Sequence, residues 1–399
     1  MARQIDQCPE KPNSNEKERT FRIRVVTPLF GGGAESRRLD PITPIRVSSI
    51  RGNLRFWWRA GRGSRYETAE QLREREKEIF GLSSVSSRLN VKVDMLCPGT
   101  VCKFSSLHLP EYVTFPFKED KAAGPIQVLK DAEFNLTLQY PADIECDVLS
   151  AVWAWVNFGG LGARTRRGCG ALFCDELSPR NVRSPSEINK WYRDQLKKYG
   201  IIPAKTPRLW PTLPDRIWTG PLHDKRKELD ANMMDAWRDV ILKYKTFRSK
   251  GYGISWTEKK SIQRILNSAE AETDAFSPSF PRAELGLPIV FHFTKENLPD
   301  TVLLPANSYR SQRMASPLIL KPMAIQNQTL SAMPVVLKLV TPRLKEAQLK
   351  LLKDHKDHEP LFHASESHIR PSRHDRNGSV SALDQFMSFI EKKGGYQAR

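Results

Sequence analysis

The segment GGLGARTRRGCGALF, residues Gly159 to Phe173, carries five glycines and three arginines directly after an apolar, tryptophan-rich run. Glycines permit positive φ and let a ligand approach the main chain, so several backbone N–H groups can point at one anion. Arginine side chains add planar forks that suit phosphate oxygens. The segment therefore predicts a phosphate-binding loop, with a glycine-rich turn whose arginines face water as the alternative. The residues expected to contact phosphate are Gly159, Gly160, Gly162, Arg164, Thr165, Arg166, Arg167 and Gly168.

Two nucleotide-binding motifs do not fit this segment. Gly160-Leu-Gly162 is followed by Ala, Arg and Thr165 where the dinucleotide fingerprint needs a third glycine, and it follows an expected helix instead of a strand. No Gly-Lys-Ser or Gly-Lys-Thr occurs in the chain, which excludes a P-loop.

Around this loop, the first half of the chain alternates strand and helix patterns. Strands are expected over 21–30, 88–96, 133–141 and 170–177, and helices over 48–60, 67–80 and 146–160. Ser48 or Ser49 is expected to cap the first helix, and Gly61 and Gly63 to stop it. If the charged helix over 67–80 is set aside, the order is strand, helix, strand, strand, helix, strand. That order is the split βαβ arrangement of ferredoxin-like folds, which RNA-binding sheet domains share.

The second half has a weaker pattern. Strands are expected over 207–213, 287–293, 315–325 and 334–340, and helices over 231–247 and 381–393. The predicted fold class is α+β, with two ferredoxin-like domains, the second degenerate and carrying helical insertions. The expected division is a flexible tail over 1–19, a first domain over 20–178 and a second over 179–399.

Composition favours an anionic partner. Lys and Arg number 63 against 45 Asp and Glu, a formal net charge of +18, and nucleic acid is the commonest partner for such an excess. No apolar run approaches the roughly 20 residues of a membrane span, and the polar N-terminus lacks a signal-peptide core. We therefore expect a soluble, cytoplasmic protein that makes no membrane contact. The six cysteines include no Cys-x-x-Cys pair, which argues against a zinc ribbon or a thioredoxin-type site.

The first expected helix has an apolar stripe and a basic stripe. Ile50, Leu54 and Trp57 should pack on the sheet, and the basic stripe consists of Arg51, Arg55 and Arg62 with Trp58 between the two stripes. One interpretation is a solvated basic face with Trp58 half buried. The other is an arginine ladder that contacts phosphates beside an aromatic ring, as nucleic-acid surfaces are commonly built.

Four segments together resemble a known family. TPLFGGGAE at residue 27, SSIRGNLRFWWRA at 48, FGGLGARTRRGCGALF at 158 and RMASPLILKPM at 313 are similar to the Cmr1-family signature of the RAMP proteins in type III-B CRISPR systems. The resemblance implies a non-catalytic subunit of an RNA-guided antiviral complex, near the 3′ end of the guide RNA (crRNA), that helps bind target RNA. Other RAMP subunits of the Cmr complex would be its neighbours. No cofactor is implied.

The resemblance also implies RNA-facing positions. They are the Gly159 to Gly170 loop, Arg51, Arg55 and Arg59 and, in the second half, Arg310, Arg313 and Lys321. The segment that contains the last three is equally well explained as an ordinary strand with a basic lead-in. The run GGGAESRRLDPITPIR at residue 31 departs from the family pattern by an inserted ESRR, which leaves the placement of that loop open.

Catalysis is the rival hypothesis, because related RAMP subunits cleave RNA with a histidine or with a loop aspartate and a divalent metal. The alternative function is therefore a RAMP-type endoribonuclease that uses Asp40 or a histidine of the second half. An aspartate between prolines is, however, typical of a turn. No histidine lies beside the first helix or the glycine-rich loop in sequence. The late histidines invite a zinc reading, but their irregular spacing favours a polar loop that is solvated or touches RNA. They are His355, His358, His363, His368 and His374.

Overall fold

The computed structural model describes most of the chain. The described residues are 15–31, 33, 38–40, 42–104, 111–114, 126–250, 258–267, 279–293, 298–305, 313–342, 349–353, 362–364 and 381–398.

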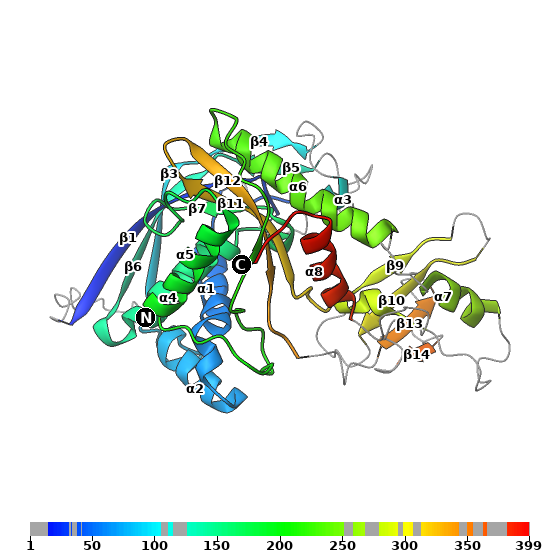
Figure 1. Cartoon of the computed structure of the whole chain (residues 1–399). Coiled ribbons are helices and arrows are strands. Elements are labelled where there is room, and N and C mark those ends of the chain that lie inside the picture. Colours follow the sequence, from blue (N-terminus) through cyan, green and yellow to red (C-terminus); the bar gives the residue numbers. More distant parts are fainter. Residues whose placement is uncertain are drawn as a thin grey trace.

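A four-stranded antiparallel sheet forms the base of the first half (Figure 1). Its strands are β1 (Glu16–Val25), β3 (Asn90–Cys97), β6 (Glu133–Pro141) and β7 (Leu172–Phe173), in the spatial order β3-β6-β1-β7. Helix α1 (Val47–Ala60) follows β1 in the chain, and helix α4 (Glu145–Phe158) lies between β6 and β7. This order and connectivity confirm the predicted ferredoxin-like arrangement.

Buried apolar side chains alternate with more exposed ones along the strands, so one face of this sheet is apolar and is covered by helices. Phe21, Ile23 and Val25 of β1 are buried, and so are the residues of β6 that face the same way, Phe134, Leu136, Leu138 and Tyr140. Helices α1 and α4 pack against each other, and Ile50, Leu54 and Trp57 are buried as predicted. The closing strand is shorter than the expected 170–177, because backbone turns over Cys174 to Ser178 follow Phe173 directly.

Several smaller elements of the first half surround the sheet. Helix α2 (Ala69–Phe80) has a capping box formed by Thr68 and Gln71, and follows the short 3₁₀ helix η1 (Arg62–Arg65). A second, three-stranded sheet has the order β2-β5-β4, from β2 (Leu29–Phe30), β5 (Gln127–Lys130) and β4 (Thr100–Lys103). Strands β4 and β5 and the short helix α3 (Glu111–Thr114) were not predicted, because each is only four residues long.

The second half contains a three-stranded sheet of order β11-β12-β8, from β11 (Leu318–Gln326), β12 (Leu330–Lys338) and β8 (Trp218–Thr219). Helix α6 (Leu229–Lys250) packs on β11 and β12, and helix α8 (Ala382–Lys392) contacts α6. Both helices and both long strands were predicted. The expected strand over 207–213 does not form, because its prolines cannot donate to a ladder, and only Thr212 makes an isolated bridge to Val340.

An inserted sheet lies to one side of the molecule (Figure 1). Its order is β14-β13-β10-β9, from β9 (Ile289–Phe291), β10 (Thr301–Pro305), β13 (Leu349–Lys353) and β14 (Phe362–Ala364), with helix α7 (Glu258–Asn267) beside it. This insertion and the other elements make the fold class α+β, as predicted.

The main core extends across the expected domain boundary. Tyr192 of helix α5 (Pro185–Lys198) stacks on Trp153 of α4 with ring centroids 6.0 Å apart. The same core includes Ile319 and Met323 of β11. Residues on both sides of position 178 therefore share one apolar cluster, and the division of the chain at that position stays a prediction. Among the described residues, no helix is both long enough and apolar enough to cross a membrane.

Candidate nucleic-acid interface

The glycine-rich loop is folded tightly on itself. It begins where α4 ends, at Gly159, and contains the 3₁₀ turn η5 (Thr165–Arg167). Three of its glycines have positive φ, as does Arg164 at 58°, and Leu161 N–H donates to Gly170 O at 2.9 Å. A Cβ on Gly170 would lie 2.0 Å from Leu161 O. These glycines are therefore required by the loop's own fold.

The loop arginines donate to backbone carbonyls instead of facing open solvent. Arg167 Nη1 donates to Leu318 O at 2.8 Å, Arg166 Nη1 donates to Ser316 O, and Arg164 Nη2 donates to Tyr112 O at 3.3 Å. Burial, with a smaller contribution from the charge of Arg167, lowers the pKa of Arg166 to about 10. All three side chains are half buried. In this conformation much of the phosphate-binding capacity predicted for them is used to hold the loop against the second half.

Aromatic rings complete these contacts. The Arg167 guanidinium lies 4.9 Å from the ring centroid of Tyr244, and Arg166 lies 5.4 Å from that of Phe56. Trp237 Nε1–H donates to Arg167 O at 2.6 Å. Tyr244 and Trp237 belong to α6, so the loop is the joint at which α6 and β11 meet the first half.

The arginines of α1 hold helix α2 in place. Arg51 donates to Leu89 O and Phe80 O, each at 2.9 Å. Arg55 Nε and Arg59 Nη1 each donate to the Glu76 carboxylate at 2.7 Å, and each arginine side chain keeps 34% of its surface exposed. Arg62, the remaining arginine of the predicted stripe, lies in η1 and donates to Asp147 Oδ1 at 2.7 Å. The predicted basic stripe is thus a network of ion pairs and carbonyl contacts in which Arg55 keeps part of its surface exposed.

Trp58 differs most from its predicted environment. Its side chain is fully buried, and its Nε1–H donates to Asp147 Oδ1 at 2.9 Å. The ring therefore lies in the core and presents no face on which a base could stack. The helical spacing placed it between the two stripes, but the neighbouring helices cover that side of α1.

The three residues of the second half that were predicted to contact RNA differ in their exposure. Lys321 is 1% exposed, and burial lowers its pKa to about 7. Arg313 is exposed. Arg310 lies outside the described residues. Of these three predicted RNA contacts, Lys321 faces the interior of the protein.

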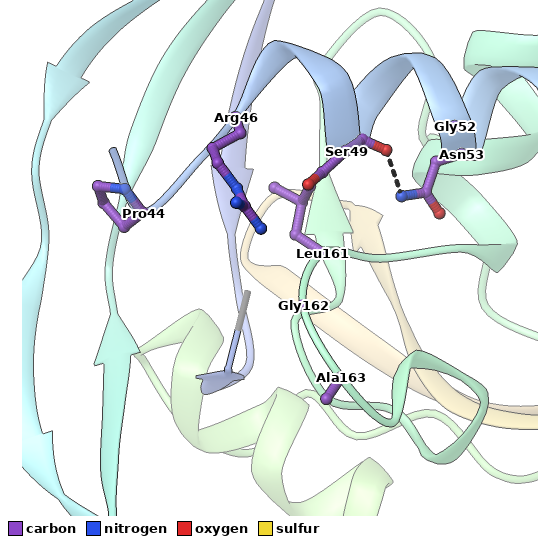
Figure 2. Close-up of a pocket in the computed structure, with 8 residues that line it drawn as sticks. All are labelled: Pro44, Arg46, Ser49, Gly52, Asn53, Leu161, Gly162 and Ala163. Atoms are coloured by element: carbon purple, nitrogen blue, oxygen red, sulfur yellow. Dashed lines mark hydrogen bonds between the residues drawn. The ribbon is translucent and has the colours of Figure 1, made fainter. Parts of the chain in front are cut away.

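A pocket opens where the glycine-rich loop faces the start of α1 (Figure 2). Its volume is about 430 Å³. Figure 2 shows Arg46 ahead of the helix, Ser49 and Asn53 on it, and the loop residues Leu161 to Ala163 opposite. Its lining consists of Pro44, Arg46, Ser49, Gly52, Asn53, Leu161, Gly162 and Ala163.

The start of α1 makes this pocket electropositive. The N-cap is Arg46, whose side chain makes no capping hydrogen bond, and no acidic residue occupies the first turn. The predicted cap at Ser48 or Ser49 is therefore wrong, since both serines lie inside the helix. First-turn N–H groups have no partner within a helix and carry its positive dipole end. With the Arg46 guanidinium beside them, these groups are suited to an anionic oxygen.

Arg46 and Asn53 were not among the residues predicted to bind RNA, and Ser49 was predicted only as a helix cap. The available signal was a basic residue directly before a helix whose first turn lacks an acid. The loop was predicted from its glycines and arginines. The opposite wall of the pocket comes from residues 44–53, far away in the chain, so the two walls meet only in the fold.

Asp40 forms a turn. Its Oδ1 accepts hydrogen bonds from Ile42 N at 3.0 Å and Thr43 N at 2.9 Å, and the Thr43 contact, followed by that from Ile42, holds the Asp40 pKa below its usual value. His363 lies in β14, and the other four late histidines lie outside the described residues. Within the described part of the chain, no cluster of three His, Cys, Asp or Glu side chains could hold a metal ion.

Comparisons with known proteins agree with the topology. A family model of the RAMP superfamily matches residues 22–173. Cmr subunit Cmr1-2 of Pyrococcus furiosus is 27% identical over 179 residues, which cover 39% of this chain and 94% of that protein. Subunit Cmr1-1 of the same organism is 30% identical over 156 residues, which cover 36% of this chain and less than half, 42%, of that protein.

The fold extends the likeness beyond the matched segment. The crystal structure of apo Cmr1 from Pyrococcus furiosus aligns with 96% of this chain and 98% of its own, with a TM-score of 0.54 and 15% identity. At that identity the alignment establishes the fold alone. Together with the matched family segment and the sequence relatives, it supports a Cmr1-family RAMP protein.

Proposed function

We propose that this protein is a non-catalytic, RNA-binding subunit of a type III-B CRISPR (Cmr) effector complex in the cytoplasm. It assembles with other RAMP subunits, lies near the 3′ end of the guide RNA and helps bind target RNA. The two sequence relatives are named as Cmr subunits. The net charge of +18 supports a polyanionic partner.

The pocket between α1 and the glycine-rich loop is the observation that carries this proposal. It combines the N-terminal end of a helix, the Arg46 side chain and the exposed main chain of Gly162. Backbone N–H groups and arginine are the donors that bind nucleic-acid phosphates without reading bases. A phosphate of the RNA backbone therefore fits this pocket, and the RNA strand would run along the glycine-rich loop.

The other residues predicted to contact RNA have different roles in this proposal. Leu161 to Ala163 of the loop form one wall of the pocket. Arg167 holds the loop against β11 through Leu318 O and against α6 through the Tyr244 hydroxyl. Arg55 and Arg59 each expose a third of their side chain on the same helix, and we propose that they extend the RNA path beyond the pocket. Arg313 is a further exposed candidate in the second half.

Replacing Arg46 by alanine tests the pocket. We expect RNA binding to weaken about tenfold, a change equivalent to roughly 1.4 kcal/mol, and the slope of log K against log salt to fall by ~0.7, the value for one phosphate contact with a single strand. The measurement is a salt series of RNA affinities with two unrelated sequences. Because the contact is to the backbone, both sequences should bind alike.

The control for this test is Arg216→Ala, which removes the same charge from an exposed side chain, 53% accessible, outside the pocket lining. If Arg216→Ala weakened binding as much as Arg46→Ala, the effect would be one of net charge and the pocket proposal would fail. Substituting Arg164, Arg166 and Arg167 together is a poorer test, because it also removes the contacts that join the loop to β11.

The non-catalytic part of the proposal has its own test. Asp40→Asn keeps the side-chain oxygen that accepts from Ile42 N and Thr43 N, but removes the negative charge that a metal-dependent reaction would need. We expect target-RNA cleavage by the reconstituted complex to be unchanged within twofold. A loss of cleavage with the complex intact would show that Asp40 participates in the reaction.

A further inference from the structure

Lys321 is a buried amine at the joint between the two halves of the chain. Its side chain is 1% exposed, in the middle of β11, where all neighbouring residues of the strand are also buried. Its Nζ donates to Gly159 O at 2.9 Å and to Val156 O at 3.4 Å. An amine enclosed in this way cannot reach a phosphate of bound RNA, so its contribution must be made through the carbonyls it contacts.

Those carbonyls belong to the end of α4. The last C=O groups of a helix lack partners within the helix and carry its negative dipole end, which a cation stabilises. The last turn of α4 contains no basic residue of its own. Lys321 therefore supplies, from a distant strand 162 residues later in the chain, the N–H donors that these carbonyls lack within the helix.

Gly159 is also the first residue of the glycine-rich loop, and it has little room to move. A Cβ at this position would lie 2.5 Å from Trp57 Nε1 and 2.6 Å from Trp155 O. Farther along, the same strand β11 accepts from Arg167 at Leu318 O. Strand β11 thus holds the loop at two points, at its start through Lys321 and at the last residue of its 3₁₀ turn through Leu318.

We infer that Lys321 is a positioning residue: through Gly159 and Val156 its amine fixes the start of the glycine-rich loop, and thereby the wall of the pocket formed by Leu161 to Ala163. This inference rests on the proposed RNA-binding function for its effect on affinity. Its effect on the loop is independent of that function.

The test compares wild type with Lys321→Met, which keeps the apolar stem and removes the donor. Two readouts are taken on protein shown to be folded by circular dichroism. One is hydrogen exchange at the amides of Leu161, which donates to Gly170 O, and Ala163, which donates to Phe30 O. The other is RNA affinity over a salt series. We expect faster exchange at both amides and roughly tenfold weaker RNA binding.

Lys338→Met is the matched control. Lys338 lies on the neighbouring strand β12, opposite Leu318. Its side-chain amine pairs with Asp384 on α8, so its removal takes away a lysine amine whose contact is not with the loop. Both readouts should equal those of wild type. If Lys321→Met does not fold, Lys321→Gln, which keeps an N–H donor on a shorter stem, is measured in its place, with a smaller change expected in the same directions.

The possible outcomes separate the inference from the function on which it rests. Unchanged exchange at Leu161 and Ala163 in folded Lys321→Met overturns the positioning role. Weaker RNA binding with unchanged exchange would likewise overturn it, because the effect on binding would then not pass through the loop. If wild type binds no RNA, the proposed function fails, and the exchange measurement alone still decides whether Lys321 positions the loop.

Discussion

The Gly170→Ala variant is expected to lose about 4 kcal/mol or more of its unfolding free energy, a large part of the stability of an ordinary domain. Two effects combine at this position. The added Cβ would lie 2.0 Å from Leu161 O, a backbone atom that cannot move without the loop, and φ is +59°, which strains any L side chain. Chemical denaturation followed by circular dichroism measures the loss.

Gly52→Ala is the matched control for that variant. Gly52 lies inside α1, and a Cβ there would meet nothing within 4 Å. Alanine should therefore stabilise the protein by about 0.5–1 kcal/mol, because glycine weakens a helix interior. If Gly170→Ala were as stable as wild type while Gly52→Ala behaved as expected, the tight packing of the loop against Leu161 would be refuted.

The Asp147→Asn variant is expected to lose roughly 3–5 kcal/mol of unfolding free energy. Asp147 is buried at the start of α4 and joins three elements. Its carboxylate accepts from Trp58 Nε1 at 2.9 Å, Arg62 Nε at 2.7 Å and Arg75 Nη2 at 2.8 Å. An amide would leave two half-buried arginines without their counter-charge, and its own N–H groups would face donors.

The same network predicts an acid dependence. Burial alone would raise the pKa of Asp147, but the hydrogen bonds from Trp58 and Arg75 and the charge of Arg62 hold it below its usual value. The folded-state pKa is thus lower than the unfolded one, so the carboxylate contributes stability above about pH 4 and loses it as the pH falls through the folded value. The stability difference between wild type and Asp147→Asn should therefore shrink in acid.

Asp143→Asn provides the control for both measurements on Asp147. Asp143 pairs with Arg88 on the surface, with 58% of its side chain exposed. Exposed pairs contribute about 0–1 kcal/mol. If Asp143→Asn lost as much unfolding free energy as Asp147→Asn, the buried network would stabilise the protein no more than an exposed ion pair does.

Local sequence pattern determined much of the fold of this protein. Alternating apolar and polar residues in β1 and β6, and the apolar stripe of α1, each specify one buried face. Elements that are adjacent in the chain pack on such a face and cover it. The ferredoxin-like order followed from those elements. Elements of two to five residues, such as β4 and β5, lack enough residues for a period to appear, and they form only because other strands offer them partners.

At the candidate site, tertiary packing decided more than the local sequence pattern did. The sequence specified the loop's glycines and its charge, because φ preferences and ionisation belong to single residues. It could not specify where the arginines point. Arg167 reaches Leu318, which is 151 residues away, and Arg46 meets the loop from the start of a different helix. Whether a guanidinium binds a carbonyl, a carboxylate or a phosphate depends on which acceptor the packing brings within 3 Å, and that is decided only by the tertiary structure.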